Sequence, residues 1–463
     1  MFKRTFEEKG SGMVIDVQRL ADPGLGNSAW LVDLGDGSAL VVDPSRDPRP
    51  ALEQAAQRGL QVSWVAETHL HADFVSGARE LIGEVPHARL IAAADADLAH
   101  PHQPVREGVE VDLGGLMLRP LATPGHTPEH LAYLLVDDGR AEALFSGGTL
   151  IVDGVARPDL ISPDRTVPLA RAAWRSITER LLTLPDDLTV YPTHGGGSFC
   201  SAGSSDRATT TIGEQRTSNP LLQVDDEDGF VERLLDGLGS FPPYFLRLRE
   251  VNRQGPRLYG TEMPPLEQLG PAALEGRLAA GARVIDVRPI ERYAQGHVPG
   301  SLSIELRDQF ATWLGWLVEA PETPLVFVLD REQDRDDLVR QCLKVGYEEL
   351  AGELAGGIVA WQEAGHDTAT TELTDLPPHD RVVVDVRQRS EWDSGHIPGA
   401  THGELGALPS TVHGLPGQRL VTHCEHGQRS MTAASILERA GRRDVAVFTG
   451  GPEEWQERGA ESA

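Results

Sequence analysis

Three short segments carry histidines in settings typical of metal ligands. The segment THLHADFVSG places His69, His71 and Asp73 at alternate positions, directly after VSWVAET, whose apolar and β-branched residues predict a buried strand. A strand that ends and turns here would direct three side chains at one point. His126 in ATPGHTPEH and His194 in YPTHGGGS each follow a short apolar run beside Gly or Pro. Imidazole and carboxylate together suit Zn, Fe or Mn, so this series of segments predicts a metal site.

The same series resembles the ligands of the metallo-β-lactamase superfamily, which has an αββα fold and binds metal through HxHxD, a GHTP histidine and a late TH histidine. The closer similarity, carried by GHTPEHLAYLL, ARPDL and YPTHGGGS, is to the persulfide dioxygenase branch and covers roughly the first half of the chain. The resemblance implies that a low-molecular-weight thiol persulfide is oxidised by O2 to sulfite at one Fe2+.

Two positions depart from the family pattern. Phe74 stands where hydrolases of this fold carry the last His of HxHxDH, which helps to hold a second metal. Gly148, in LFSGGTL, stands where the family has an aspartate ligand. The resemblance with these departures implies one metal per chain, with Fe2+ expected and Zn2+ as the alternative. A decayed site without metal also stays open.

The ligands expected from the resemblance are His69, His71 and His126, with Asp73 and His194 around them or reached through water. Restoring the carboxylate by Gly148→Asp is expected to tighten metal binding.

Three further residues are candidates for contact with substrate. Arg157 in ARPDL and Arg216 in TIGEQRTSNP could bind the carboxylates of a thiol cofactor by bidentate contacts, or form structural salt bridges. Cys200 follows His194 in the same Gly/Ser-rich segment. It is read either as a small buried hydrophobic residue or as part of the wall of a persulfide pocket.

The second half of the chain contains an internal repeat. VIDVRPIERYAQGHVPGSLSIEL, from Val284, matches VVDVRQRSEWDSGHIPGATHGEL, from Val383, and GGIVAWQEAG, from Gly356, matches GGPEEWQERG, from Gly450. Both copies resemble the rhodanese domain, an α/β fold that moves sulfane sulfur.

Only the second copy carries the residues for that chemistry. In LVTHCEHGQRS, Cys424 follows an apolar strand, and Arg429 stands in front of an apolar helix. Backbone N–H groups of the loop, the helix N-terminus and Arg429 would stabilise the thiolate, which is the nucleophile. The resemblance implies that Cys424 carries a persulfide during turnover. The first copy has Leu329 or Asp330 in the place of the cysteine, depending on the gap, and is expected to be silent, serving packing or bridging the two active domains.

Composition limits the partners. The 463-residue chain has 70 Asp and Glu against 42 Lys and Arg, which argues against nucleic acid and anionic membranes. Three scattered cysteines favour a reducing compartment, and the sequence shows no targeting signal and no run as long as a membrane span. A cytoplasmic location is therefore expected. The partners expected are a thiol persulfide, O2, sulfite and thiosulfate, and a homo-oligomer is left open.

The organisation predicted is a multidomain α/β protein. Residues 1–250 form the metallo-β-lactamase-fold domain, 251–269 a linker, 270–370 the inactive rhodanese-like domain and 371–463 the catalytic rhodanese domain. The function expected is iron-dependent persulfide oxidation coupled to rhodanese-type sulfur transfer, as in sulfide detoxification. The alternatives are a zinc-dependent thioester hydrolase of the glyoxalase II type and a sulfur-relay rhodanese with a non-catalytic N-terminal scaffold.

Overall fold

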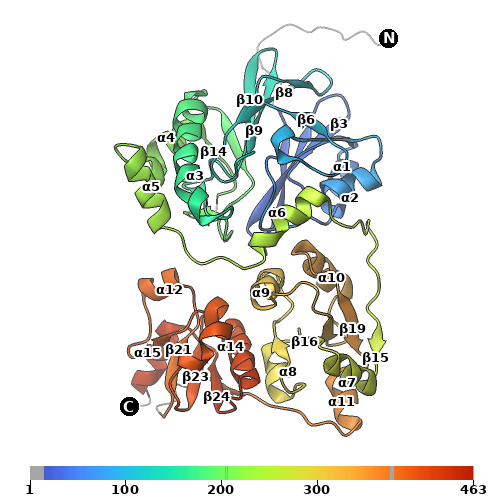
Figure 1. The fold of residues 1–463 in the computed structure, drawn as a ribbon, viewed down its shortest axis with the longest axis vertical. Coiled ribbons are helices and arrows are strands. Elements are labelled where there is room, and N and C mark those ends of the chain that lie inside the picture. Colours follow the sequence, from blue (N-terminus) through green and yellow to red (C-terminus); the bar gives the residue numbers. More distant parts are fainter. Residues whose placement is uncertain (1–14, 204, 206, 376–379, 462–463) are drawn as a thin grey trace.

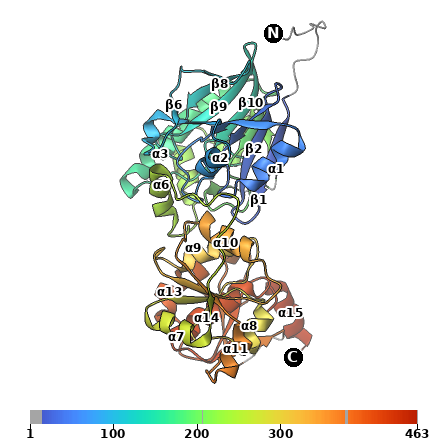
Figure 2. The ribbon, with the colours of Figure 1, turned by 90° about the vertical axis from the view of Figure 1, so that its right-hand side faces the viewer.

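A computed structural model describes residues 15–203, 205, 207–375 and 380–461 of the chain. Figure 1 shows an N-terminal domain in blue to green above two smaller α/β units, one yellow to brown and one red, which lie side by side. Figure 2, turned by 90°, shows the same division between the upper domain and the lower pair.

The N-terminal domain is built on two six-stranded sheets. Along the first sheet the strands lie in the order β1 (Val17–Asp22), β2 (Asn27–Asp33), β3 (Ser38–Val42), β4 (Gln61–Ala66), β5 (Arg89–Ala93) and β6 (Gln103–Val105). Along the second they lie in the order β14 (Thr210–Thr211), β12 (Thr189–Pro192), β10 (Arg140–Gly147), β9 (Leu131–Asp137), β8 (Met117–Ala122) and β7 (Val111–Asp112). A small ribbon pairs β11 (Val155–Ala156) with β13 (Ser201–Ala202).

Alternation along the strands sorts side chains between two cores. In β2, Trp30 and Val32 face the second sheet, where they share a core with Tyr133 and Phe145, while Leu31 faces the opposite side. That outer face of the first sheet is covered by α1 (Arg49–Gln57) and α2 (Ala78–Glu84). The outer face of the second sheet is covered by α3 (Pro163–Arg175) and α5 (Glu227–Asp236). The layers are helix, sheet, sheet and helix, which confirms the predicted αββα fold.

Two further α-helices of this domain are α4 (Ile212–Ser218) and α6 (Phe245–Gln254). The sequence placed a linker from residue 251, but α6 continues through this position. Asn252 explains the difference, because its amide donates to the carbonyls of His71 and Phe74 at 2.8 and 2.9 Å, and its Oδ1 accepts from the N–H of Ser76 at 2.8 Å. The end of α6 therefore braces the loop that carries the first predicted ligands.

The two smaller units repeat one topology. The first contains β15 (Gln268–Leu269), α7 (Pro271–Ala279), β16 (Arg283–Asp286), α8 (Ile290–Gln295), β17 (Leu302–Ser303), α9 (Phe310–Leu317), β18 (Leu325–Val328), α10 (Arg335–Lys344), β19 (Leu350–Leu354) and α11 (Gly357–Glu363). The second contains β20 (Glu372–Thr374), β21 (Val382–Asp385), α12 (Arg389–Ser394), β22 (Thr401–His402), α13 (Leu408–Thr411), β23 (Leu420–His423), α14 (Gln428–Arg439), β24 (Val445–Phe448) and α15 (Pro452–Glu461). The strand orders β15-β19-β18-β16-β17 and β20-β24-β23-β21-β22 correspond strand for strand.

The repeated D-V-R motif has a structural task in both units. Arg288 forms a bidentate pair with Asp286 and donates to the carbonyl of Gly296 at 2.9 Å. In the second unit Arg387 pairs with Asp385 in the same way and reaches the carbonyl of Gly395 at 2.7 Å. The motif thus fastens the strand end to the G-H-(V/I)-P-G turn in each unit.

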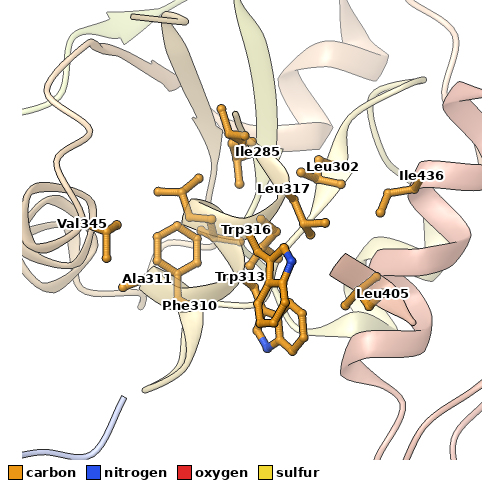
Figure 3. Close-up of a cluster of buried hydrophobic side chains, with 14 of the residues drawn as sticks. Ile285, Leu302, Phe310, Ala311, Trp313, Trp316, Leu317, Val345, Leu405 and Ile436 are labelled. Carbon is orange, nitrogen blue, oxygen red and sulfur yellow. The ribbon is translucent and has the colours of Figure 1, made fainter. Parts of the chain in front are cut away.

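One helix of the first unit joins all three parts of the chain. Every residue of α9 is buried, as its sequence FATWLGWL requires for a helix apolar on all sides. Trp316 packs edge-on against Phe199 of the N-terminal domain, with ring centroids 4.8 Å apart, and lies against Gly406 of the second unit. Figure 3 shows Trp313 and Trp316 at the centre of the shared apolar cluster, with Leu405 and Ile436 of the second unit on one side. This packing fits the expectation that the silent copy bridges the other two domains.

Within the described residues, no helix has the length and apolar character needed to cross a membrane.

Candidate functional site

Asp43 organises the end of the two sheets where the predicted ligands lie. It follows β3, is buried, and adopts a left-handed φ of 50°, a strained conformation for a residue other than glycine. Its carboxylate accepts hydrogen bonds from the N–H and hydroxyl of Thr68, each at 2.7 Å, and from the hydroxyl of Thr193. Asp43 thereby ties together the two loops that carry His69 and His194. The sequence analysis did not single out Asp43, although this acid comes directly after the apolar run SALVV.

Three buried histidines each hold Nδ1 in a hydrogen bond and leave Nε2 free. The Nδ1–H of His126 donates to the carbonyl of Arg157 at 2.7 Å, and that of His194 donates to the amide oxygen of Asn27 at 3.1 Å. Because the hydroxyl of Thr68 donates to Asp43, its oxygen must accept from Nδ1–H of His69, at 2.8 Å.

The free Nε2 atoms of these histidines carry lone pairs that face one another. Nε2 of His69 lies 3.4 Å from Nε2 of His194, and Nε2 of His126 has no hydrogen-bond partner among the residues that the structure describes. Lone pairs facing at this distance repel unless a cation lies between them. Nδ1 contacts that fix the tautomer are typical of metal-binding histidines.

His71 presents the opposite nitrogen to the same cluster. Its Nε2 lies 2.9 Å from Glu67 and 3.3 Å from Asp43, and within the described part of the chain its Nδ1 has no hydrogen-bond partner. Burial alone would lower the pKa of His71, but Asp43 and Glu67 outweigh it and raise the pKa to about 10. Burial lowers the pKa of His126 to about 3 and also lowers that of His69. These two histidines are therefore neutral, as a metal ligand must be.

Asp73 lies on the edge of this cluster. One carboxylate oxygen accepts from Asn27 at 2.7 Å and lies 3.3 Å from Nδ1 of His194, while the other, Oδ1, has no hydrogen-bond partner in the described ranges. The structure thus brings the five predicted metal residues together, and His69, His71 and His194 have nitrogen atoms within 4.8 Å of one another. Unpartnered buried lone pairs from several histidines and a carboxylate fit a divalent metal ion.

The two departures from the family pattern have visible consequences. The ring of Phe74 stacks on His71 with centroids 4.2 Å apart, so an apolar group fills the place of a second-metal ligand. At Gly148 an added Cβ would lie 2.8 Å from Cδ2 of His126 and 3.0 Å from the Cβ of Ala156. The space that an aspartate would need is taken by a ligand ring, which is contrary to the expectation that Gly148→Asp tightens metal binding.

His130, which the sequence analysis also did not single out, forms hydrogen bonds with other residues of the chain through both ring nitrogens. Its Nε2 accepts the backbone N–H of Gly148 at 3.0 Å, so its Nδ1–H is left to donate to the hydroxyl of Thr123 at 2.9 Å. The motif GHTPEH contains the signal, since its second histidine comes directly before β9 and its ring stacks on that of His69, with centroids 5.0 Å apart.

The two arginines predicted to contact substrate have partners inside the chain. Arg157 is buried and forms a bidentate pair with Asp159, and its guanidinium also donates to the carbonyls of Phe199 and Gly239. Arg216, on α4, is exposed and pairs with Asp186. Both therefore fit the structural salt-bridge alternative, and the carboxylate-binding role is not supported.

The second rhodanese-like unit presents Cys424 at the end of β23. The loop that follows turns into α14 at Gly427, whose φ of 87° favours glycine. Cys424 is 2% exposed, and a Cβ on Gly427 would lie 2.9 Å from Ile290, so the silent unit packs against this loop. Arg429 forms a bidentate pair with Glu391 of α12 at 2.6 and 2.8 Å. Burial lowers the pKa of Arg429, but Glu391 and the nearby sulfur of Cys424 together raise it.

Strand register identifies the residue that replaces the cysteine in the silent unit. Asp286 lies opposite Val328 in the first unit, and Asp385 lies opposite His423 in the second. The residue after each strand is therefore Leu329 in one unit and Cys424 in the other. Of the two candidates left open by the sequence, Leu329 is the equivalent residue.

Comparison with known proteins agrees with this architecture. The metallo-beta-lactamase superfamily profile matches residues 22–194, and the rhodanese-like domain profile matches residues 270–364 and 369–458. A hydroxyacylglutathione hydrolase of Photobacterium profundum is 30% identical over 227 residues, covering 49% of this chain and 81% of that protein. The chain belongs to the metallo-beta-lactamase superfamily. Two rhodanese-like domains follow its metallo-beta-lactamase domain, as the sequence predicted.

Two further similarities widen the comparison. Persulfide dioxygenase ETHE1, mitochondrial, of Homo sapiens is 28% identical over 225 residues, covering 47% of this chain and 80% of that protein. The crystal structure of a metallo-beta-lactamase from Staphylococcus aureus subsp. aureus COL superposes with a TM-score of 0.64 at 25% identity, covering 74% of this chain and 99% of that chain. The superposition extends beyond the first domain of this metallo-beta-lactamase-fold protein. Together the domains indicate an enzyme of sulfur metabolism with a metal-binding site.

Proposed function

We propose that the protein oxidises a low-molecular-weight thiol persulfide to sulfite at a single metal ion and transfers sulfane sulfur through Cys424. The observation that carries the proposal is the pairing in one chain of a cluster of free histidine nitrogens with a cysteine at a rhodanese strand end. The overall oxidation balances as RSSH + O2 + H2O giving RSH, sulfite and two protons. When bound, Fe2+ would supply the site that activates O2 and the persulfide sulfur.

The residues of the metal cluster have distinct tasks in this proposal. His69, His71, His126 and His194 would hold the ion, since each offers one nitrogen without a hydrogen-bond partner or facing another such nitrogen. Asp43, Asn27 and the carbonyl of Arg157 orient those rings. Phe74 favours a one-metal site, because it replaces a ligand of the second metal with an apolar ring.

Cys424 would perform the second reaction. Its thiolate attacks a sulfane sulfur, the bond from that sulfur to its carrier breaks, and the carrier leaves as a thiol or as sulfite. The Cys424 persulfide then passes its outer sulfur to sulfite, which gives thiosulfate and regenerates the thiolate. Joining both sites in one chain raises the concentration of sulfite near Cys424.

Paired assays test the oxidation against thioester hydrolysis, the alternative favoured by the 81% coverage of the Photobacterium hydrolase. Protein reconstituted anaerobically with Fe2+ is given glutathione persulfide, and oxygen uptake and sulfite are followed; Zn2+-loaded protein is given S-lactoylglutathione. We expect sulfite and thiosulfate together to equal the O2 consumed in the first assay, and no turnover in the second. Thioester hydrolysis without oxygen uptake would contradict the proposal. Failure of both, with Cys424 still active, would favour the relay protein with an N-terminal scaffold.

A further inference from the structure

Cys200 is fixed against the histidine cluster by the same residue that orients His126. The N–H of Arg157 donates to the carbonyl of Cys200 at 2.8 Å, and the carbonyl of Arg157 accepts Nδ1–H of His126 at 2.7 Å. Just beyond Cys200, β13 pairs with β11, which ends at Ala156. The cysteine and the histidine are therefore held in register by one short ribbon.

The thiol points into the cluster. Ligand atoms of His126, His194 and Cys200 all lie within 4.8 Å of one another, and the side chain of Cys200 is 0% exposed. His126 is 1% exposed, and no residue that the structure describes forms a hydrogen bond with its Nε2. An unpartnered imidazole nitrogen on a residue this close to a buried sulfur is explained if both residues bind one ion.

The charge of the cluster gives the reason for a thiolate. At position 148 the family's carboxylate is missing, and the ring of His126 occupies the space that its Cβ would need. Asp73 lies at the edge of the cluster with one oxygen bonded to Asn27, so histidines with at most this one carboxylate would leave a divalent metal with net positive charge in a buried site, which is costly. One thiolate gives the site the same net charge as one carboxylate.

We propose that Cys200, as a thiolate, is the anionic ligand that replaces the missing aspartate and binds the metal together with His126 and His194. The inference rests on the metal site of the proposed function. Histidine and cysteinate together bind Zn2+ and Fe2+ readily, and coordination deprotonates the thiol. Cys200 is thus neither a sulfur carrier nor only a packing residue.

Co2+ tests this assignment without any assay of turnover, since a cysteine thiolate bound to Co2+ gives an intense near-ultraviolet charge-transfer band. Full-length protein is titrated anaerobically with Co2+, and the band and the bound Co2+ per chain are measured for wild type, Cys200→Ser, Cys342→Ser and Cys424→Ser. Cys342 is the matched control, a fully buried thiol on α10 of the silent domain. Circular dichroism verifies that each variant is folded.

We expect wild type, Cys342→Ser and Cys424→Ser to bind one Co2+ with the band. Cys200→Ser should lose the band and bind Co2+ about 10- to 100-fold more weakly. Binding of Co2+ by wild type without the band would overturn the assignment and leave the histidine site intact. A band that persists in Cys200→Ser would also overturn it. If folded wild type bound no Co2+ at all, both the assignment and the proposed metal site would fail.

Discussion

Gly148 and His126 are packed so closely that a Cβ on the glycine would lie 2.8 Å from Cδ2 of the imidazole ring. The ring cannot rotate away freely, because its Nδ1–H is bonded to the carbonyl of Arg157. A side chain at position 148 and the present position of the His126 ring are therefore incompatible unless one of them shifts.

Substituting Gly148 should weaken metal binding, whichever side chain is added. We expect Gly148→Ala and Gly148→Asp both to lower Co2+ affinity and to destabilise the fold by about 1–3 kcal/mol through overpacking. The alanine variant isolates the effect of the Cβ from that of the carboxylate. Metal titration with thermal unfolding checks both; tighter binding in Gly148→Asp than in wild type would mean that the family's ligand can still be accommodated.

Replacing the nucleophile should separate the two activities. Cys424→Ser is expected to abolish thiosulfate:cyanide sulfur transfer while leaving oxygen uptake on persulfide largely intact, because Cys424 and the histidines lie in different domains. The transfer assay and an oxygen electrode on the same preparation measure both. Substantial transfer by the serine variant would show that another thiol is the nucleophile.

The silent rhodanese-like domain should tolerate substitution in the loop after β18, which corresponds to the Cys424 loop of the second unit. Asp330 follows Leu329, the residue equivalent to Cys424, and we expect Asp330→Ala to change neither activity by more than about twofold, roughly 0.5 kcal/mol on the barrier. Steady-state rates of the folded variant provide the check. A large, selective loss of sulfur transfer would assign this loop a part in the chemistry.

Metal binding should release protons and strengthen as pH rises. With a pKa of about 10, His71 is protonated at neutral pH in the metal-free protein, so a metal that takes its Nδ1 must displace one proton. In Cys200→Ser, where no thiol proton is released, affinity should therefore increase up to about tenfold per pH unit until the pH approaches that pKa. Calorimetry of Cys200→Ser in two buffers of different ionisation enthalpy counts this proton; a count of zero at pH 7 would argue that His71 is not a ligand.

The local parts of this architecture could be predicted from the sequence, and the long-range contacts could not. HxHxD, GHTP and the repeated D-V-R motif each lie within one short segment, so they could be recognised from residue types and spacing alone. Asp43 and Asn27 hold ligand loops from strands far away in sequence, and only the fold shows which polar side chain ends beside which ring. Likewise the choice between Leu329 and Asp330 required the strand register.

The distribution of persulfide sulfur between sulfite and thiosulfate tests the central claim that two sites act in sequence. Fe2+-loaded wild type and Cys424→Ser are each given glutathione persulfide in air-saturated buffer, and oxygen uptake, sulfite and thiosulfate are quantified together. The account predicts thiosulfate as the main product of wild type, with one O2 taken up for every two persulfides consumed, and sulfite as that of the variant, with one O2 for each persulfide. Oxygen uptake absent from both, or the same product from both, would contradict it.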